Sequence, residues 1–463
     1  MKKTVYGLFL LMFILFSSCS EDVIIDDEPG KKEETKDEKA KKWIESTLRD
    51  QYLFYEDMPE KTNLSLDTED FFNSLLSDKD GKTRNGSHYY YSYLEEYTPD
   101  TKASSQSDSY GFEFASLPSD AGDYYFVWVL YVLPNSPAEE AGLKRGDWIL
   151  GINDDVKNIS NLNVLLSGSA KQFTIGSYDE VTGTFRVEKN LSIPAARQVE
   201  NTPFLCDTTF HKDGRTIGYM LYNHFTVGLD DYDMNETTYD NLMIEKMRNF
   251  QNQGVTEFVL DLRYNGGGNI ISAQKLATML APLSALDKLF CILEGNNKQH
   301  EKTSYWLEKN EVGGVNLNLS HLYVLVSSST ASASELVVNA LIPYMGRENI
   351  TLIGTQTEGK NVGSLTIGID SDYGYLLHPI TFYVFNKERK ADYANGFPAD
   401  IEIEELIVGE TLYPFGNERD AMLNAALRKI TNKPLRTRSI ANKQLPSNQK
   451  VSYTPRIRGL YTR

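Results

Sequence analysis

Residues 321–341, with the sequence HLYVLVSSSTASASELVVNAL, join a buried strand pattern directly to an apolar helix pattern. Five serines and one threonine lie within the eight positions 327–334, where the two patterns meet. One interpretation is that these hydroxyls cap the helix, since Ser and Thr are favoured N-cap residues. The other is that one serine is a nucleophile, placed where backbone amides can stabilise an oxyanion. This stretch therefore raises a structural and a catalytic hypothesis together.

Strand and helix patterns continue to alternate on both sides of this stretch. The predicted strands cover residues 217–222, 258–262, 322–326 and 350–353, and the predicted helices cover residues 239–253, 270–280 and 334–344. Such alternation is typical of an α/β core, which we place at residues 199–435. The chain has 463 residues, more than one hydrophobic core usually supports, so the whole is predicted to be a multidomain α/β (α+β) protein.

Charge and composition exclude several classes of function. The net charge of −17 disfavours nucleic acid as a partner, because phosphate binding requires a basic surface. Six histidines and three cysteines show no metal-ligand spacing, so neither a metal nor another cofactor is expected. Cys206 and Cys291 both lie in apolar strand-like stretches, and the sequence allows either one disulfide or two buried thiols.

The first 19 residues read as a targeting signal. A basic Met-Lys-Lys start precedes an apolar run over 5–16 that is too short to span a bilayer comfortably, and Ser17, Ser18 and Cys19 follow. This pattern resembles a bacterial lipoprotein signal, which implies lipidation of Cys19; a plain secretory peptide is the alternative. The expected location is the cell envelope, lipid-anchored at the outer membrane, facing the periplasm or on the cell surface.

Three further regions are predicted around the core. Residues 20–40 are charged and lack an apolar period, which is typical of a disordered linker. Residues 41–104 carry amphipathic helix patterns and are expected to form a small helical domain. Residues 436–463 are polar and basic and are expected to be a loosely held tail.

The region 105–198 resembles a PDZ domain. The resemblance rests on residues 136–153, SPAEEAGLKRGDWILGIN, which follow a β-rich run over 124–133. It implies that the loop with Gly111, Phe112 and Phe114 receives the C-terminal carboxylate of a peptide, while a neighbouring strand pairs with that peptide. The alternative is a structural PDZ domain that clamps its own chain.

Two more segments of the core carry chemical signals. Residues 261–268, DLRYNGGG, leave a predicted strand through three glycines, which bring backbone amides close to a bound group. The segment lacks the Gly-Lys-Ser/Thr ending of a phosphate loop, so nucleotide binding is a poor interpretation. Residues 354–364, GTQTEGKNVGS, place Lys360 in a glycine-flanked turn, where an isolated lysine would ordinarily be a solvated surface residue.

Together, these segments resemble the S41 peptidases, the C-terminal processing or tail-specific protease family. The family pattern is Asp-Leu-Arg-x-Asn-x-Gly-Gly, then Ser-Ala-Ser-Ala-Ser-Glu, then Gly-x-x-x-x-Gly-Lys, with a PDZ domain usually preceding the core. All four elements occur here in order, over roughly residues 105–405. The helical domain and lipoprotein signal resemble Bacteroidetes-type members, and the core is expected to be of the ClpP/crotonase type.

The resemblance implies roles for individual residues. Ser332 is the expected nucleophile and Lys360 the general base, which must be neutral and therefore buried. The amide of Ala333 and a glycine amide, that of Gly268 or else Gly267, would stabilise the oxyanion. Many relatives carry a Gln four residues after the lysine; this chain has Ser364 there, whose hydroxyl could also accept from the lysine amine. Some relatives use a Ser–His arrangement, for which His224 is the best-placed candidate.

The predicted function is a serine endopeptidase that cleaves proteins or peptides and whose PDZ domain recognises C-terminal segments of its substrates. The alternative is a catalytically weak or inactive lipoprotein in which the PDZ domain binds peptides as a scaffold. Residues 395–401, NGFPADI, resemble a family segment that we interpret as structural. The sequence does not indicate an oligomeric state.

Overall fold

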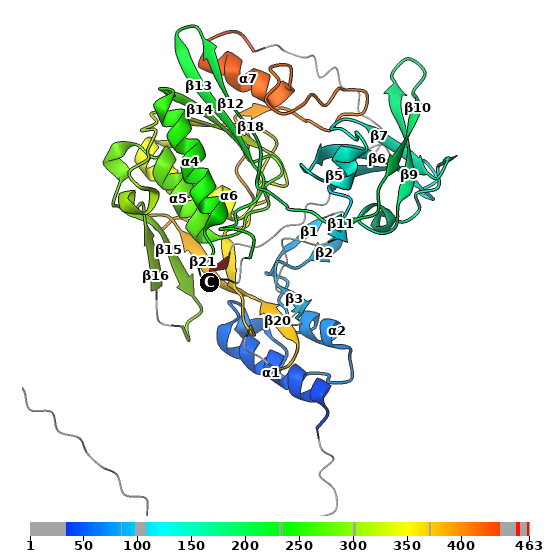
Figure 1. Cartoon of the computed structure of the whole chain (residues 1–463). Coiled ribbons are helices and arrows are strands. Elements are labelled where there is room, and N and C mark those ends of the chain that lie inside the picture. The colour runs from blue at the N-terminus through cyan, green and yellow to red at the C-terminus, as the bar shows by residue number, and fades with distance from the viewer. Residues whose placement is uncertain are drawn as a thin grey trace, which may run out of the picture.

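The architecture was derived from a computed structural model. It describes residues 34–84, 86–97, 108–230, 233, 235–299, 302–369, 372–435 and 451–453, and the backbone of 461–462. Three regions are visible in Figure 1: an N-terminal domain (34–97) at one end, a β-domain (108–198), and an α/β domain (204–435) beside it. The predicted lipidation site Cys19 and most of the predicted tail lie outside the described residues.

The α/β domain is built on a six-stranded sheet with the order β12-β13-β14-β17-β18-β22. β12 and β13 form an antiparallel hairpin, and the other neighbouring strands pair in parallel. The strand bounds are Phe204–Lys212, Arg215–Tyr222, Glu257–Asp261, Leu322–Val326, Ile350–Gly354 and Ile401–Glu402. The fold class predicted from the sequence is confirmed.

Helices cover both faces of this sheet, as parallel strands require. On one face lie α4 (Thr238–Asn252), α5 (Ile270–Leu280) and α6 (Ala333–Met345), whose apolar side chains share one core with the strands. The amphipathic helix α7 (Ala421–Ile430) packs on the other face. The segments that follow β14, β17 and β18 leave the sheet at the same edge, because the carboxyl ends of parallel strands coincide. This edge therefore gathers the three motifs of the core.

A second sheet adjoins this edge and was largely missed by the sequence patterns. Its order is β16-β15-β21-β19-β23. The bounds are Lys302–Trp306, Leu289–Gly295, Ile380–Phe385, Val362–Leu365 and Tyr461–Thr462. β19 begins two residues after Lys360, so the segment that carries the lysine continues directly into this sheet.

The β-domain is an antiparallel sheet with the order β10-β9-β7-β6-β5, and β8 pairs with β7. The strand bounds, from β5 to β10, are Phe112–Pro118, Tyr125–Val132, Trp148–Ile152, Asp155–Val156, Lys171–Asp179 and Thr184–Ile193. The short helix α3 (Pro137–Glu140) begins as expected, with Pro137 in its first turn and the hydroxyl of Ser136 accepting from the Glu139 amide at 3.1 Å. β4 (Asp108–Ser109) pairs with β11 (Arg197–Gln198), and β5 lies at the edge of the main sheet.

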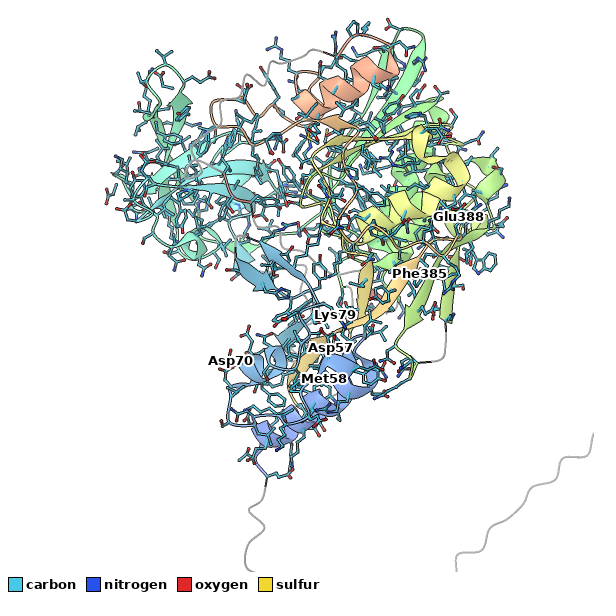
Figure 2. The ribbon with its side chains drawn as sticks, turned by 180° about the vertical axis from the view of Figure 1, so that it is seen from behind. Asp57, Met58, Asp70, Lys79, Phe385 and Glu388 are labelled. Atoms are coloured by element: carbon cyan, nitrogen blue, oxygen red, sulfur yellow. The ribbon has the colours of Figure 1, made fainter. Side chains whose placement is uncertain are left out.

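The N-terminal domain begins earlier than its sequence pattern suggested. Helix α1 (Lys36–Gln51) starts inside the range predicted as linker, because Thr35 and Glu38 form a capping box. α2 (Thr68–Asn73) follows, and the domain also contains strands: β1 (Lys82–Arg84) pairs with β2 (Ser87–Tyr89). Its compact packing is visible from behind in Figure 2, where Lys79 lies beside Asp57, its ion-pair partner at 2.9 Å.

A strand from the α/β domain completes the N-terminal domain. β3 (Tyr93–Glu96) pairs antiparallel with β20 (Tyr375–His378), which comes almost 280 positions later in the chain. Leu377 and Ile380 belong to the same buried cluster as Ile44 and Phe71 of the two helices. The N-terminal domain is therefore not a separate folding unit but shares its core with the rest of the chain.

The two cysteines whose state the sequence left open are free thiols. Cys291 is fully buried in β15, and Cys206 is partly buried in β12. Burial raises the pKa of the Cys206 thiol to about 11, so it is protonated at neutral pH. Among the helices of the described residues, none combines the length and apolarity needed to cross a bilayer.

A buried arginine connects the β-domain to the α/β domain. Arg145 donates to Glu405 at 2.5 Å and to the hydroxyl of Tyr264 at 3.0 Å, and its guanidinium lies 4.3 Å from the ring centre of Phe415. Arg263 donates to the same Oε1 atom of Glu405. Because Tyr264 directly precedes the Asn265-Gly-Gly-Gly turn, the domain interface and the glycine turn share one rigid network.

Arg145→Ala is expected to lower the free energy of unfolding by about 3–5 kcal/mol, since it leaves the buried carboxylate of Glu405 with one cation fewer. Thermal unfolding followed by circular dichroism would measure the loss. The matched control is Arg197→Ala in the same domain, whose ion pair with Glu140 is exposed and is worth about 0–1 kcal/mol. Equal destabilisation by both variants would contradict a role for the buried network.

Candidate active site

Ser332 occupies a strained position between strand β17 and helix α6. It is the N-cap of α6, is 1% exposed, and has φ 58° and ψ −112°, a backbone conformation that residues other than glycine rarely adopt. Strain of this kind persists only where the surroundings enforce it, and it is frequent at active sites. The structure therefore distinguishes Ser332 from the other hydroxyls of its run.

Several of the neighbouring hydroxyls fasten this turn to the glycine turn after β14. Thr330 donates to the carbonyl of Leu262 at 2.8 Å, and Ser334 donates to the carbonyl of Asn265 at 3.0 Å. Ser327 donates to the carbonyl of Arg263. The sequence analysis expected helix capping and turn formation from these residues. The hydroxyls of Ser327 and Thr330 also shape the turn itself, since they accept from the amides of Ser329 and Ser327. The bonds that the hydroxyls donate satisfy buried carbonyls and hold the two turns together.

The glycine turn lies directly against the candidate nucleophile. A Cβ atom on Gly267 would lie 2.8 Å from Cβ of Ser332 and 3.1 Å from the amide nitrogen of Ala333, so only glycine fits there. The Gly267 amide is engaged, since it donates to Oδ1 of Asn265 at 2.9 Å. Within the described part of the chain, no group accepts from the amides of Gly268 or Ala333. These two amides are the donors available to an oxyanion, and Gly267 provides the space beside them.

The carboxylate of Glu335 joins the nucleophile turn to the lysine turn. Its Oε2 accepts from the amide of Ser332 at 3.0 Å and from the amide of Lys360 at 2.8 Å. Its Oε1 accepts from the amide of Gly359 at 2.7 Å and from the hydroxyl of Thr357 at 2.5 Å. The amides of Ser332 and Lys360 donate to the same oxygen atom, Oε2. The two amide nitrogens are therefore held within two hydrogen-bond lengths of each other.

Lys360 is buried in an environment that favours its neutral form. Its side chain is 2% exposed, and its Nζ lies 4.7 Å from the ring centre of Tyr91. Desolvation lowers the pKa of Lys360 to about 8, although the nearby carboxylates of Asp80, Glu358 and Glu335 act in the opposite direction. A substantial fraction of the amine is therefore neutral at mildly alkaline pH, as a general base requires.

The N-terminal domain supplies the cover over this lysine, through Glu358. The carboxylate of Glu358 is fully buried and accepts from the hydroxyl of Tyr91 at 2.9 Å and from Tyr89 and Arg84. Lys82 donates to the backbone carbonyl of Glu358. The sequence analysis did not single out Glu358. The sequence feature that could have pointed to Glu358 is its position, as an acidic residue two positions before Lys360 in a predicted turn.

The remaining predicted site residues lie at three places. Ser364 is 3% exposed in β19, four residues after Lys360, and pairs with Ile380 of β21. His224 follows β13, next to Phe225, whose amide donates to the carbonyl of Gly267 at 2.9 Å. His224 thus lies on the segment that flanks the glycine turn. The catalytic roles suggested for Ser364 and His224 stay predictions.

The predicted peptide loop of the β-domain lies at the start of the edge strand β5. The amide of Gly111 donates to the hydroxyl of Ser109 at 2.9 Å, so this amide is already engaged. The ring centres of Phe112 and Phe114 lie 5.7 Å apart, and Phe112 packs on Phe173 in the domain core. The edge position of β5 suits the addition of a peptide strand, while carboxylate binding by Gly111 stays a prediction.

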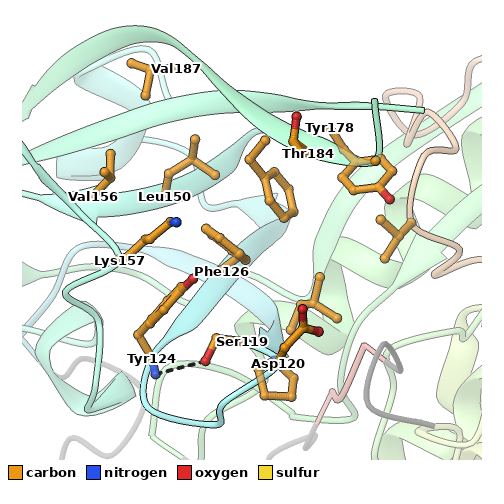
Figure 3. A pocket seen from close by; sticks show the side chains of 15 residues that line it. Ser119, Asp120, Tyr124, Phe126, Leu150, Val156, Lys157, Tyr178, Thr184 and Val187 are labelled. Carbon is orange, nitrogen blue, oxygen red and sulfur yellow. Dashed lines mark hydrogen bonds between the residues drawn. The ribbon is translucent and has the colours of Figure 1, made fainter. Parts of the chain in front are cut away.

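A pocket of about 290 Å³ on the β-domain contains none of the predicted site residues. Figure 3 shows the side chain of Phe126 within it, near Leu150 and Thr184, with Lys157 and Tyr124 along one side. The dashed bond joins the amide of Tyr124 to the hydroxyl of Ser119. Over the described residues, no group of three or more His, Cys, Asp or Glu side chains gathers as a metal site.

Three family models match the chain in the predicted order. A model for peptidase family S41 matches residues 216–403, one for the peptidase S41 N-terminal domain matches 39–93, and one for the PDZ domain matches 128–164. The predicted order of a helical N-terminal region, a PDZ domain and an S41 core is thereby confirmed.

Similar proteins carry the same family names. A Bacteroides fragilis protein assigned to the S41 proteases has a crystal structure that matches 84% of this chain and 97% of its own, with a TM-score of 0.73 and 34% identity. A carboxyl-terminal-processing protease of Picosynechococcus is 29% identical over 237 residues, half of each chain. The chloroplastic carboxyl-terminal-processing peptidase 1 of Arabidopsis thaliana is 30% identical over 53% of this chain and 46% of its own. The chain thus spans about half the length of the curated relatives it matches.

The pKa of Lys360 predicts how peptide cleavage depends on pH. Because only the neutral amine accepts a proton, kcat/KM should rise about tenfold per pH unit below a midpoint near pH 8 and level off above it. A pH profile of kcat/KM on a peptide substrate measures the midpoint. Lys360→Arg should lose activity throughout this range, since a guanidinium stays protonated. Alkaline activation retained in the arginine variant would exclude Lys360 as the base.

Glu335→Gln is expected to lower kcat/KM by about 10²–10³-fold. The four donors now share two carboxylate oxygens, whereas the glutamine amide has only one acceptor oxygen for them. Steady-state kinetics would measure the loss, and circular dichroism would establish that the fold is retained. Glu348→Gln, just beyond the C-terminal end of the same helix, is the matched control. Activity equal to that of the control would refute the positioning role of Glu335.

Proposed function

Because this chain belongs to peptidase family S41, we propose that it is a serine endopeptidase in which Ser332 is the nucleophile and Lys360 the general base. The observation that carries the proposal is the shared carboxylate of Glu335, which holds a strained serine and a buried lysine together. The neutral lysine would take the proton of the Ser332 hydroxyl as the oxygen attacks a peptide carbonyl.

The negative charge that develops on the carbonyl oxygen would be stabilised by the amides of Ala333 and Gly268. One such donor typically contributes about 10²–10³ in rate. The protonated lysine would then return its proton to the leaving amine, and water would release the acyl group from Ser332 in a second cycle of the same kind. Every proton transfer uses groups present in the chain, so the proposed cycle needs no cofactor.

Substrates and location are parts of the same proposal. The PDZ domain supports recognition of extended peptide segments by strand addition to β5, and the names of the relatives favour C-terminal segments as substrates. The lipoprotein-like residues 16–19 support a location in the cell envelope, with a lipid at Cys19. Growth with radiolabelled palmitate, with and without globomycin, which blocks lipoprotein signal cleavage, would test the anchor. Protein that carries no radiolabel would refute lipidation of Cys19.

Ser332→Ala should lower kcat/KM on an unfolded reporter protein by at least about 10³-fold, because the nucleophilic oxygen is removed. Ser328→Ala, an exposed serine of the same turn, is the control and should cleave at the normal rate. Mass spectrometry after treatment with a fluorophosphonate should find the label on Ser332. Equal cleavage by both variants would exclude this serine. Peptide binding without cleavage or labelling would favour the scaffold function.

A further inference from the structure

A segment near the end of the sequence already occupies the edge of the β-domain sheet. Ser452 pairs antiparallel with Ser116 of β5 through two backbone hydrogen bonds, each 2.8 Å long. One runs from the Ser116 amide to the Ser452 carbonyl, and the other returns from the Ser452 amide to the Ser116 carbonyl. This is the geometry of an added peptide strand on a sheet edge.

The side chains of residues 451–453 alternate as in a bound strand. Val451 and Tyr453 are partly buried in the cluster that contains Ala115 and Leu117, whereas Ser452 is exposed. The ring of Tyr453 meets that of Tyr264 edge-on, with 5.6 Å between their centres. Since Tyr264 precedes the glycine turn, this strand contacts both the β-domain and the segment that leads into the glycine turn.

A second contact of the same kind lies beside the catalytic lysine segment. β23 pairs in parallel with β19, with Tyr461 opposite Ser364 and Thr462 opposite Leu365. β23 also lies against α5, the helix that begins two residues after Gly268. In Figure 1 the end of the chain is marked beside β21, the other neighbour of β19. The backbone of residues 461–462 thus lies against both the strand that follows Lys360 and the helix that follows the glycine turn.

Charge favours the return of this segment to the body of the protein. Residues 436–463 contain seven Lys or Arg residues and no Asp or Glu, whereas the whole chain has a net charge of −17. Opposite charges on two parts of one chain attract each other over long range, and salt screens this attraction. Attraction of this kind adds to the backbone hydrogen bonds at β5 and β19.

We propose that the two tail strands, residues 451–453 and 461–462, are an intramolecular peptide ligand that occupies the docking edges of β5 and β19. The inference rests on the proposed peptidase function, because it assigns these edges to the substrate path. The partner that fits the β5 edge is an extended segment with apolar or aromatic residues at alternate positions, as Val451 and Tyr453 are placed here. The tail therefore competes with substrate and raises the apparent KM without changing the catalytic groups.

The kinetic test compares the full chain, a chain that ends at Leu435, and Ser452→Pro, which removes the amide that bonds Ser116. Both changes should lower KM for an unfolded reporter protein by about 3–10-fold and leave kcat unchanged. A synthetic peptide of residues 446–463 should restore the high KM of the shortened chain, and the same residues in scrambled order should not. Lys433→Ala, which removes an exposed ion pair before the tail, should behave as the full chain.

Hydrogen exchange provides a test that does not need activity. In the Ser332→Ala background, the Ser116 amide should exchange at least about tenfold faster in the chain that ends at Leu435 than in the full-length chain. Unchanged KM and unchanged exchange, together with loss of cleavage in Ser332→Ala, would overturn the tail inference and leave the peptidase function intact. Absence of cleavage in every chain, with faster exchange on truncation, would refute the function and retain the tail as a ligand.

Discussion

The buried carboxylate of Glu335 is the constraint on which the candidate active site depends. A carboxylate that is fully removed from water is costly unless donors satisfy both of its oxygens. Burial raises the pKa of Glu335 to about 7, yet four donors from two separate turns converge on it. Moving either turn would leave an unsatisfied charge in the core. The relative position of Ser332 and Lys360 is therefore fixed by electrostatics rather than by packing alone.

The same site depends on a domain that contributes none of the predicted catalytic groups. Lys360 can act as a base only if water is kept from its amine, and Tyr91 of the N-terminal domain covers it. Glu358 holds that cover in place through Tyr89, Tyr91 and Arg84. The α/β domain thus carries the candidate catalytic residues, and the N-terminal domain covers Lys360. The β-domain presents the edge strand β5.

Local patterns predicted the parts of the fold that local physics determines. The bounds of β17 and α5 agree with the predicted residues, because apolar runs and flanking turns are contained in the segments themselves. The candidate residues Ser332 and Lys360 were found because their turns resemble motifs of the S41 peptidases. The pairing of β3 with β20, the contacts of Glu358 and the strand pairing of Ser452 were missed. Each joins segments at least 250 residues apart, and no local periodicity encodes such a pairing.

The pairing of β3 with β20 has a consequence for the order in which the molecule matures. The N-terminal helices are synthesised first, but residues 375–378, which complete their domain, emerge about 300 residues after α2 ends at Asn73. Closing so long a loop is entropically costly and slow. The apolar faces of α1 and α2 therefore stay uncovered until residues 375–378 can pack against them. Until they dock, Tyr91 cannot shield Lys360, whose amine stays hydrated and protonated. The topology thus makes the shielding of Lys360 depend on a contact that can form only after residues 375–378 have been synthesised.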